Sequence, residues 1–175
     1  MERLGLDYLI QCDTDGQHPI ELIPDMLREA VRQKADLLIG SRFADKPLPG
    51  VLPCNDGENA KSTTMARMVG LWFISQALRM FNRRIRIVDP TSGFRVYSRT
   101  AATDILANMP DDYPEPESIA LLMVKGRCIT ECQVPMKARS GGRSSIRGMH
   151  QLLYMVKVLS ALLGLRMRAF RENHQ

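Results

Sequence analysis

The sequence predicts an α/β domain in which a mostly parallel sheet is flanked by helices. Its 175 residues, 45% of them hydrophobic, are enough for one compact domain with a substantial core. Short apolar runs alternate with segments of helical periodicity, which is the pattern of strands connected by helices. We expect residues 1–146 to form the body of the domain. Residues 147–175 should add a basic amphipathic helix that completes the domain or contacts a membrane surface.

The first part of the chain predicts two strands, a helix and a long loop. Residues 6–12 form an apolar run and are expected to be a buried strand. A helix should begin near Pro24, because proline suits the first helical turn, and should end near Gln33. Residues 36–40 are expected to be a second strand. Residues 44–60 are rich in proline and glycine and should form a mobile loop or lid.

The middle of the chain predicts a long amphipathic helix over residues 62–82. Met65, Met68, Trp72 and Phe73 follow its three-four spacing. Such a stripe belongs in the core, or else it lines a groove for an acceptor molecule.

The second half of the chain predicts further alternation of helices and strands. Residues 89–98 should be a loop that leads into a short strand, and Ser98 can cap a helix over residues 99–107. The stretch "PEPESIALLMVKG" predicts another helix, closed by Gly126. Residues 127–134 alternate as a strand does, so the sequence supplies every element of an α/β sandwich.

The charge of the chain favours an anionic partner. Lys and Arg outnumber Asp and Glu by 24 to 19, and they gather in the "RRIR" cluster and in the last forty residues. Aromatic residues make up 6% and do not alternate with the basic ones, so we expect no nucleic acid partner. The terminal apolar run is interrupted by Lys157 and is too short to cross a bilayer, but it suits an anionic lipid surface.

The cysteines show no metal-ligand spacing and no disulfide framework. They are Cys12, Cys54, Cys128 and Cys132. With no signal peptide at the start of the sequence, we expect a cytoplasmic protein in which each cysteine is a small buried hydrophobe.

Two carboxylates follow the first predicted strand. Asp13 and Asp15 should lie beyond the carboxyl end of the sheet, where open α/β sheets bind ligands. Close carboxylates repel unless a cation lies between them, and their oxygens suit Mg²⁺ or Mn²⁺ shared with the phosphates of a diphosphate. The alternative interpretation of this Asp-x-Asp-Gly stretch is a simple turn with Asx-type hydrogen bonding.

The ordered motifs "DTDGQHP", "IGSRF", "DPTSGFR", "YPEPE" and "VPMKARSGGRSS" resemble those of a family-2 glycosyltransferase of the GT-A fold, which is Rossmann-like. The match is closest to the branch of polyprenyl-phosphate sugar transferases and cell-wall glycosyltransferases, and it covers residues 6 to about 165. It implies metal-dependent, inverting transfer of a sugar from a nucleotide-sugar donor. The implied acceptor is a polyprenyl phosphate or a membrane-associated glycan, at the cytoplasmic face of the membrane.

The resemblance implies a role for each motif. It assigns metal binding to Asp13, Asp15 and Gln17, and binding of the donor diphosphate to Asp13, Asp15, Arg139, Gly142 and Ser144. It assigns binding of the acceptor or its phosphate to Arg42, Ser92, Arg95 and Arg143, and the role of catalytic base to Asp89. The alternatives are a solvated basic loop over residues 139–145 and, for Asp89 and Pro90, an ordinary turn. For His18, a hydrogen bond to the Asp-x-Asp turn is as good an interpretation as catalysis, so it stays outside the catalytic set.

Two departures from the family bear on activity. Family members carry further strand and helix units before the Asp-x-Asp strand, so the sequence resembles a transferase truncated at its N-terminus. The missing units would leave a sheet edge and apolar surface uncovered, which predicts a homo-oligomer or poor solubility. Ser145 stands where the lipid-phosphate branch often has lysine, which weakens that assignment.

Two other functions stay open. One is a catalytically inert remnant that binds metal or an anionic surface. The other is an aspartate-nucleophile phosphotransferase, with Asp13 as nucleophile and Asp15 as acid, although Gln17 and "SGFR" fit the transferase pattern better.

Overall fold

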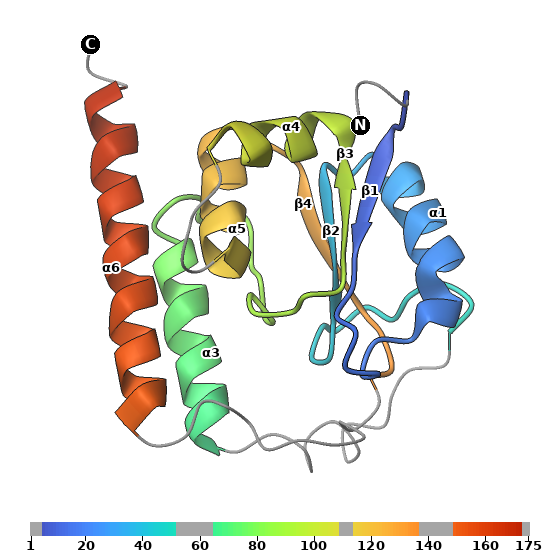
Figure 1. The fold of residues 1–175 in the computed structure, drawn as a ribbon, viewed down its shortest axis with the longest axis horizontal. Coiled ribbons are helices and arrows are strands. Elements are labelled where there is room, and N and C mark those ends of the chain that lie inside the picture. The colour runs from blue at the N-terminus through green and yellow to red at the C-terminus, as the bar shows by residue number, and fades with distance from the viewer. Residues whose placement is uncertain (1–4, 52–64, 109–113, 137–148, 173–175) are drawn as a thin grey trace.

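The computed structural model describes residues 5–51, 65–108, 114–136 and 149–172. Its strands are β1 (Tyr8–Gln11), β2 (Leu37–Ser41), β3 (Arg95–Ser98) and β4 (Ile129–Gln133). Its helices are η2 (Ile20–Leu22), α1 (Ile23–Gln33), α3 (Met65–Leu78), α4 (Arg99–Ala107), α5 (Pro114–Val124) and α6 (Met149–Glu172). Helices lie on both faces of a single sheet (Figure 1), so the predicted α/β class is confirmed and is consistent with a GT-A-like fold.

The sheet is mixed, with the strand order β1-β3-β2-β4. β2 and β4 are parallel, but β3 is antiparallel to both of its neighbours, β1 and β2. The expectation of a mostly parallel sheet was therefore wrong, because the alternation of side chains along a strand does not encode its direction. β1, β2 and β4 run the same way, so their carboxyl ends and the beginning of β3 meet at one end of the sheet (Figure 1).

Alternate residues of the central strand face two separate cores. Leu37 and Ile39 of β2 pack into a core with α3, α4, α5 and α6. Leu38, between them, packs into a smaller core with Met26 of α1 and Phe94. Because all of β2 is buried on both faces, it reads as a continuous apolar run. The sheet is therefore packed between two layers of helices, one on each face.

β1 is an edge strand and is only partly buried. It pairs with β3 alone, and Leu9 keeps 42% of its surface exposed. The expectation of a buried strand was wrong here, because a strand at the edge has a neighbour on one side only. Among the described residues no strand pairs with the other side of β1, and self-association through this edge stays a prediction.

Helix signals in the sequence match the structure. Pro24 lies in the first turn of α1, and Lys34 ends that helix in the left-handed region with φ 51°. Ser98 caps α4, since its hydroxyl accepts a hydrogen bond from the N–H of Ala101 at 3.2 Å. Gly126, with φ 69°, follows the end of α5. Of the expected loop over residues 44–60, the described residues 44–51 contain no helix and no strand of the sheet, and residues 52–60 lie outside the described part of the chain.

α3 is mostly apolar, and the side of the helix that faces the core is not the side of the predicted stripe. Leu71, Ile74 and Leu78 are buried. Trp72 and Phe73 are 57% and 48% exposed. Of the two places predicted for the stripe, the core and the lining of a groove, the structure does not support the core for Trp72 and Phe73, because the opposite side of α3 makes the core contacts.

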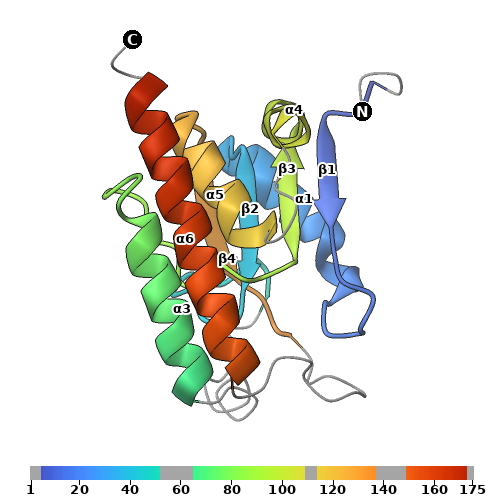
Figure 2. The same ribbon diagram turned by 60° about the vertical axis from the view of Figure 1, so that its left-hand side comes forward.

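α6 belongs to the domain rather than standing apart from it. It packs beside α3 and against α5 (Figure 2), and its Val158 and Leu162 are completely buried in the larger core. None of the helices in the described ranges is both long enough and apolar enough to span a membrane.

The cysteines differ in burial. Cys132 is buried, and burial raises the pKa of its thiol to about 12. Cys12 and Cys128 are exposed, so the expectation that every cysteine is buried was wrong for these two. Cys54 lies outside the described residues.

Candidate functional site

Charged residues from separate parts of the chain gather around His18 at the carboxyl end of the sheet. Asp13 and Asp15 follow β1, Arg42 follows β2, and Asp89 precedes β3. All of them act on the imidazole electrostatically. The pKa of His18 lies below its usual 6.5, because burial opposes the charged form more strongly than the carboxylates favour it. The sheet therefore assembles motifs that are far apart in the sequence.

His18 orders the turn that carries Asp13. Its Nδ1 accepts a hydrogen bond from the backbone N–H of Asp13 at 2.9 Å, and its ring stacks on Phe94 with 5.2 Å between the ring centroids. An acceptor nitrogen carries no proton, so the neutral ring is protonated at Nε2, 3.8 Å from Asp13 Oδ2. The expected structural hydrogen bond of His18 is thus present.

The side chain of Asp13 rests on the backbone of Gly93. A Cβ atom at position 93 would lie 2.7 Å and 2.8 Å from the two carboxylate oxygens of Asp13, so the carboxylate or the loop would have to move to admit it. The Asp13 side chain still keeps 56% of its surface exposed. Gly93 was not among the predicted site residues, although a glycine inside "SGFR" was the signal that could have found it.

The Asp-x-Asp turn is also an Asx-type turn. Asp15 Oδ1 accepts a hydrogen bond from the backbone N–H of Gln17 at 3.1 Å. This bond uses one oxygen of the carboxylate and fixes its direction. The turn interpretation and the metal interpretation therefore describe the same local structure, and they do not exclude each other.

The carboxylates of this turn fit a hard divalent cation that is shared with a phosphate ligand. Within the described ranges, no group of three or more His, Cys, Asp or Glu side chains is arranged to hold a metal alone. Mg²⁺ usually takes only one or two carboxylates and completes its shell with water and phosphate oxygens. The exposed carboxylate of Asp13 and the neighbouring Asp15 provide such a partial set.

Arg42 and Asp89 form a buried ion pair. Arg42 Nε lies 2.8 Å from Asp89 Oδ2, and its second guanidinium nitrogen lies 2.9 Å from Oδ1. Asp89 has no exposed surface and Arg42 has 9%. This forked geometry is the strongest that an arginine offers to a carboxylate. Because Asp89 is paired with Arg42 and has no exposed surface, an acceptor could reach its carboxylate only after a local rearrangement.

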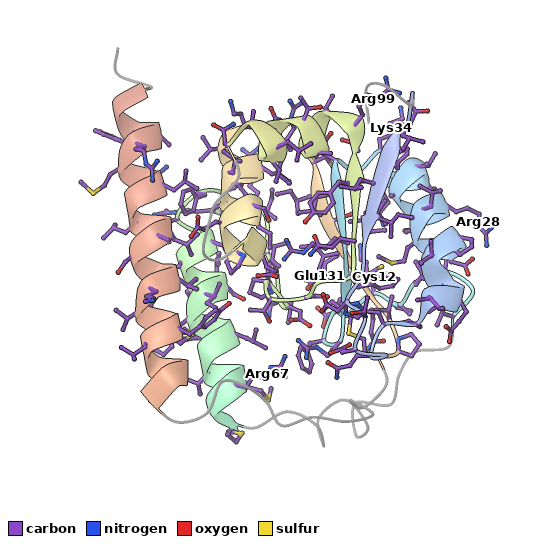
Figure 3. All side chains as sticks on the ribbon, viewed as in Figure 1. Cys12, Arg28, Lys34, Arg67, Arg99 and Glu131 are labelled. Atoms are coloured by element: carbon purple, nitrogen blue, oxygen red, sulfur yellow. The ribbon has the colours of Figure 1, made fainter. Side chains whose placement is uncertain are left out.

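Glu131 of β4 holds the loop that carries Asp89. Its carboxylate accepts the backbone N–H groups of Val88 and Asp89, both at 2.8 Å. Burial raises the pKa of Glu131, and the two backbone hydrogen bonds oppose that shift. Figure 3 shows Glu131 at the same end of the sheet as Cys12, the residue before Asp13. Glu131 was not among the predicted site residues. The signal that could have found it is an acidic residue within an alternating strand.

Ser92 and Arg95 are buried parts of the same loop. The hydroxyl of Ser92 donates a hydrogen bond to the carbonyl of Gly40 and accepts the N–H of Phe94 at 3.3 Å. Both residues were predicted to contact the acceptor or its phosphate, and that contact stays a prediction.

Arg95 has no exposed surface and ties the loop to α5. Its guanidinium donates to the carbonyls of Ser92, Pro90 and Glu115 at 2.6, 2.9 and 3.0 Å, and to the hydroxyl of Ser118 at 3.0 Å. A phosphate contact by Arg95 would require some of these bonds to open. The predicted residues Arg139, Gly142, Arg143 and Ser144 lie outside the described part of the chain.

Comparisons with known proteins point in one direction. No family model matches the chain. It is 31% identical over 147 residues to an undecaprenyl-phosphate mannosyltransferase of Micrococcus luteus, an alignment that covers 82% of the chain and 55% of that protein. It is 25% identical over 164 residues to a UDP-N-acetylglucosamine–dolichyl-phosphate N-acetylglucosaminyltransferase of Methanococcus voltae, covering 94% of the chain and 60% of that protein.

An uncharacterised protein of Methanocaldococcus jannaschii is 26% identical over 140 residues, covering 80% of the chain and 53% of its own length. The chain therefore spans little more than half the length of the curated relatives it matches. The names of the two characterised relatives support a relationship to glycosyltransferases that act on polyprenyl phosphates.

Proposed function

We propose that the chain carries the metal and acceptor part of an inverting glycosyltransferase. The enzyme would transfer a sugar from a nucleotide-sugar donor to a polyprenyl phosphate or a membrane-associated glycan. The observation that carries the proposal is the arrangement at the end of the sheet, where the carboxylate of Asp13 lies 3.8 Å from the His18 ring and is followed closely by Asp15, while Arg42 and Asp89 form a buried ion pair. Similarity to two transferases of polyprenyl phosphates supports it.

Asp13 and Asp15 would hold Mg²⁺ or Mn²⁺, with Gln17 as a further contact. When bound, the cation neutralises the developing charge on the departing diphosphate. The hydrogen bond from the Asp13 N–H to His18 orders the turn, and the Asp13 carboxylate lies beside Gly93. Little reorganisation would then be needed when the donor binds.

The buried ion pair favours an acceptor that is already ionised. A sugar hydroxyl needs a base as its bond to the donor forms, and Asp89 was the predicted base. Both oxygens of Asp89 accept hydrogen bonds from Arg42, and the carboxylate is completely buried. A lipid phosphate carries its charge at neutral pH and needs cationic groups rather than a base. Polyprenyl phosphate is therefore the acceptor that this geometry supports best.

A location at the cytoplasmic face of a membrane suits such an acceptor. Exposed apolar side chains of α6, among them Leu163, Met167 and Phe170, stand beside the exposed basic residues Lys157 and Arg168. Apolar surface flanked by cations binds anionic lipid.

A transfer assay tests the proposal. The chain is incubated with a radiolabelled nucleotide sugar, Mn²⁺ and polyprenyl phosphate, and label is counted in an organic extract. We expect extractable label that needs the metal and disappears in Asp15→Asn. Release of phosphate from a generic phosphoester would instead favour the phosphotransferase, and metal binding without nucleotide binding or transfer would favour the inert remnant.

A further inference from the structure

A cavity of about 690 Å³ opens between α3 and the segment that leads into Asp89. Met68, Leu71 and Trp72 of α3 form its apolar wall, and Phe43 and Val88 lie across from them. Small-molecule sites commonly have volumes of about 300–1,000 Å³ and apolar walls with few polar groups. The cavity therefore has the size and character of a ligand site.

Three arginines give this cavity one strongly charged side. Arg79, Arg83 and Arg86 line it, and all three are exposed. Within the described ranges, none of them forms an ion pair with a carboxylate. The hydrogen bond found for the side chain of Arg79 is a weak one, at 3.3 Å to Gln76. These guanidinium groups suit the oxygens of a phosphate.

The cavity adjoins the candidate site through two residues of its lining. Phe43 directly follows Arg42, whose guanidinium lies 5.2 Å from the centre of the Phe43 ring. Val88 directly precedes Asp89, and Glu131 fixes both of their backbone N–H groups. A molecule in the cavity would therefore lie beside the buried ion pair.

The apolar wall is exposed to an unusual degree. Met68 is 47% exposed and Trp72 is 57% exposed, while the other side of α3 meets the core. Large exposed apolar side chains in one patch mark a surface that binds an apolar partner. With the arginines at its rim, that partner should be amphiphilic, with an anionic head and an apolar tail.

We infer that this cavity binds the first isoprene units of a polyprenyl phosphate, with Arg79, Arg83 and Arg86 around the phosphate group. The inference rests on the proposed function and adds to it a place for the acceptor. It predicts recognition of both parts of the ligand at once, since the apolar wall and the arginines belong to the same cavity.

The only tryptophan of the chain, Trp72, reports on this cavity directly. Farnesyl monophosphate is titrated into the metal-free chain below its critical micelle concentration, and tryptophan emission is recorded. We expect a saturable blue shift, because an apolar chain replaces water around the indole ring. Farnesol and inorganic phosphate, which each carry one half of the ligand, should bind at least tenfold more weakly.

Variants separate specific binding from adsorption. Arg79→Ala/Arg83→Ala should weaken farnesyl phosphate by about tenfold or more, the effect of losing one charge-assisted hydrogen bond. Arg28→Ala/Lys125→Ala removes the same charge from exposed positions outside the cavity lining and serves as the matched control. Met68→Gln should weaken farnesyl phosphate without changing the response to inorganic phosphate.

Three outcomes would overturn the inference. They are equal affinity for farnesol, equal affinity for inorganic phosphate, and equal losses in the two double variants, which would indicate adsorption to a charged surface. The assay needs neither metal nor donor, so Asp15→Asn should bind farnesyl phosphate normally. If farnesyl phosphate binds this way but no nucleotide binds with Mn²⁺, the cavity assignment stands and the proposed transferase fails.

Discussion

The carboxylate of Asp13 lies against the backbone of Gly93, eighty positions further along the chain. A Cβ on Gly93 would come within 2.7 Å of one oxygen and 2.8 Å of the other. The position of the Asp13 side chain therefore depends on the absence of a side chain at position 93 in the "SGFR" motif. A side chain at position 93, two residues before β3, would have to displace the Asp13 carboxylate or move the loop.

Gly93→Ala should weaken binding of Mn²⁺ several-fold. The added methyl group must move either the Asp13 side chain or the loop, and both changes disturb the direction of the carboxylate. Titration of the chain with Mn²⁺, followed by electron paramagnetic resonance, measures the affinity. Gly164→Ala is the control, because a Cβ there meets no atom within 4 Å. Equal Mn²⁺ affinity in Gly93→Ala and wild type would show that the contact is unimportant.

Arg42→Ala should destabilise the fold by about 3–5 kcal/mol, because it leaves the carboxylate of Asp89 buried without its partner. Urea denaturation followed by circular dichroism measures the change. The double variant Arg42→Met/Asp89→Asn should recover part of the lost stability, since it removes both charges. A loss below about 1 kcal/mol in Arg42→Ala, the range of exposed ion pairs, would mean that water reaches Asp89.

Glu131→Gln should loosen the loop before β3. The amide oxygen can still accept one backbone N–H, but the amide nitrogen faces the other N–H and cannot accept it, at a cost of about 1–3 kcal/mol. Hydrogen exchange of the Val88 and Asp89 amides should speed up in this variant, while exchange in the buried strand β2 changes less. Unchanged protection at both amides would show that Glu131 does not hold this loop.

How far the sequence predicted this structure depends on the kind of signal. Local signals worked: Pro24 lies in the first turn of α1, Ser98 caps α4, and Asp13 does follow a strand. Each of these features is determined by residues close together in the sequence, because capping and first-turn preferences depend on local hydrogen bonds and backbone angles.

Non-local features were beyond the sequence. Nothing near Asp89 shows that Arg42, forty-seven positions earlier, takes both of its oxygens. Likewise nothing in the sequence around Arg95 reveals that five protein groups accept hydrogen bonds from its guanidinium, so a buried structural arginine was predicted to be a phosphate ligand. The antiparallel direction of β3 and the side of α3 that faces the core were not predicted for the same reason, because both depend on packing between distant segments.

Stability should fall at low pH through Asp36. Burial alone raises the pKa of Asp36, but hydrogen bonds from the Cys128 N–H and from the Ser98 and Thr100 hydroxyls outweigh it and hold the pKa below 3.8. A lowered folded-state pKa adds stability above the ordinary aspartate pKa, and this stability is lost as pH falls through the folded value. The melting temperature should therefore drop below about pH 4.

Asp36→Asn provides the comparison for that pH profile. The amide cannot ionise, so the variant should be less stable at pH 7 and should lose less of its stability between pH 5 and pH 3 than wild type does. Parallel profiles for the two proteins would remove Asp36 as the source of the acid sensitivity.

Coupled binding of a divalent cation and a nucleoside diphosphate tests the central claim most directly. Isothermal titration calorimetry of uridine and guanosine diphosphate, with and without Mn²⁺, is performed on wild type and on Asp15→Asn. We predict that one diphosphate binds tightly only with Mn²⁺, and that Asp15→Asn abolishes this coupling while leaving the melting temperature within a few degrees. Diphosphate affinity that is the same with and without Mn²⁺, or the same in Asp15→Asn, would contradict the proposal that this turn holds a metal for a sugar donor.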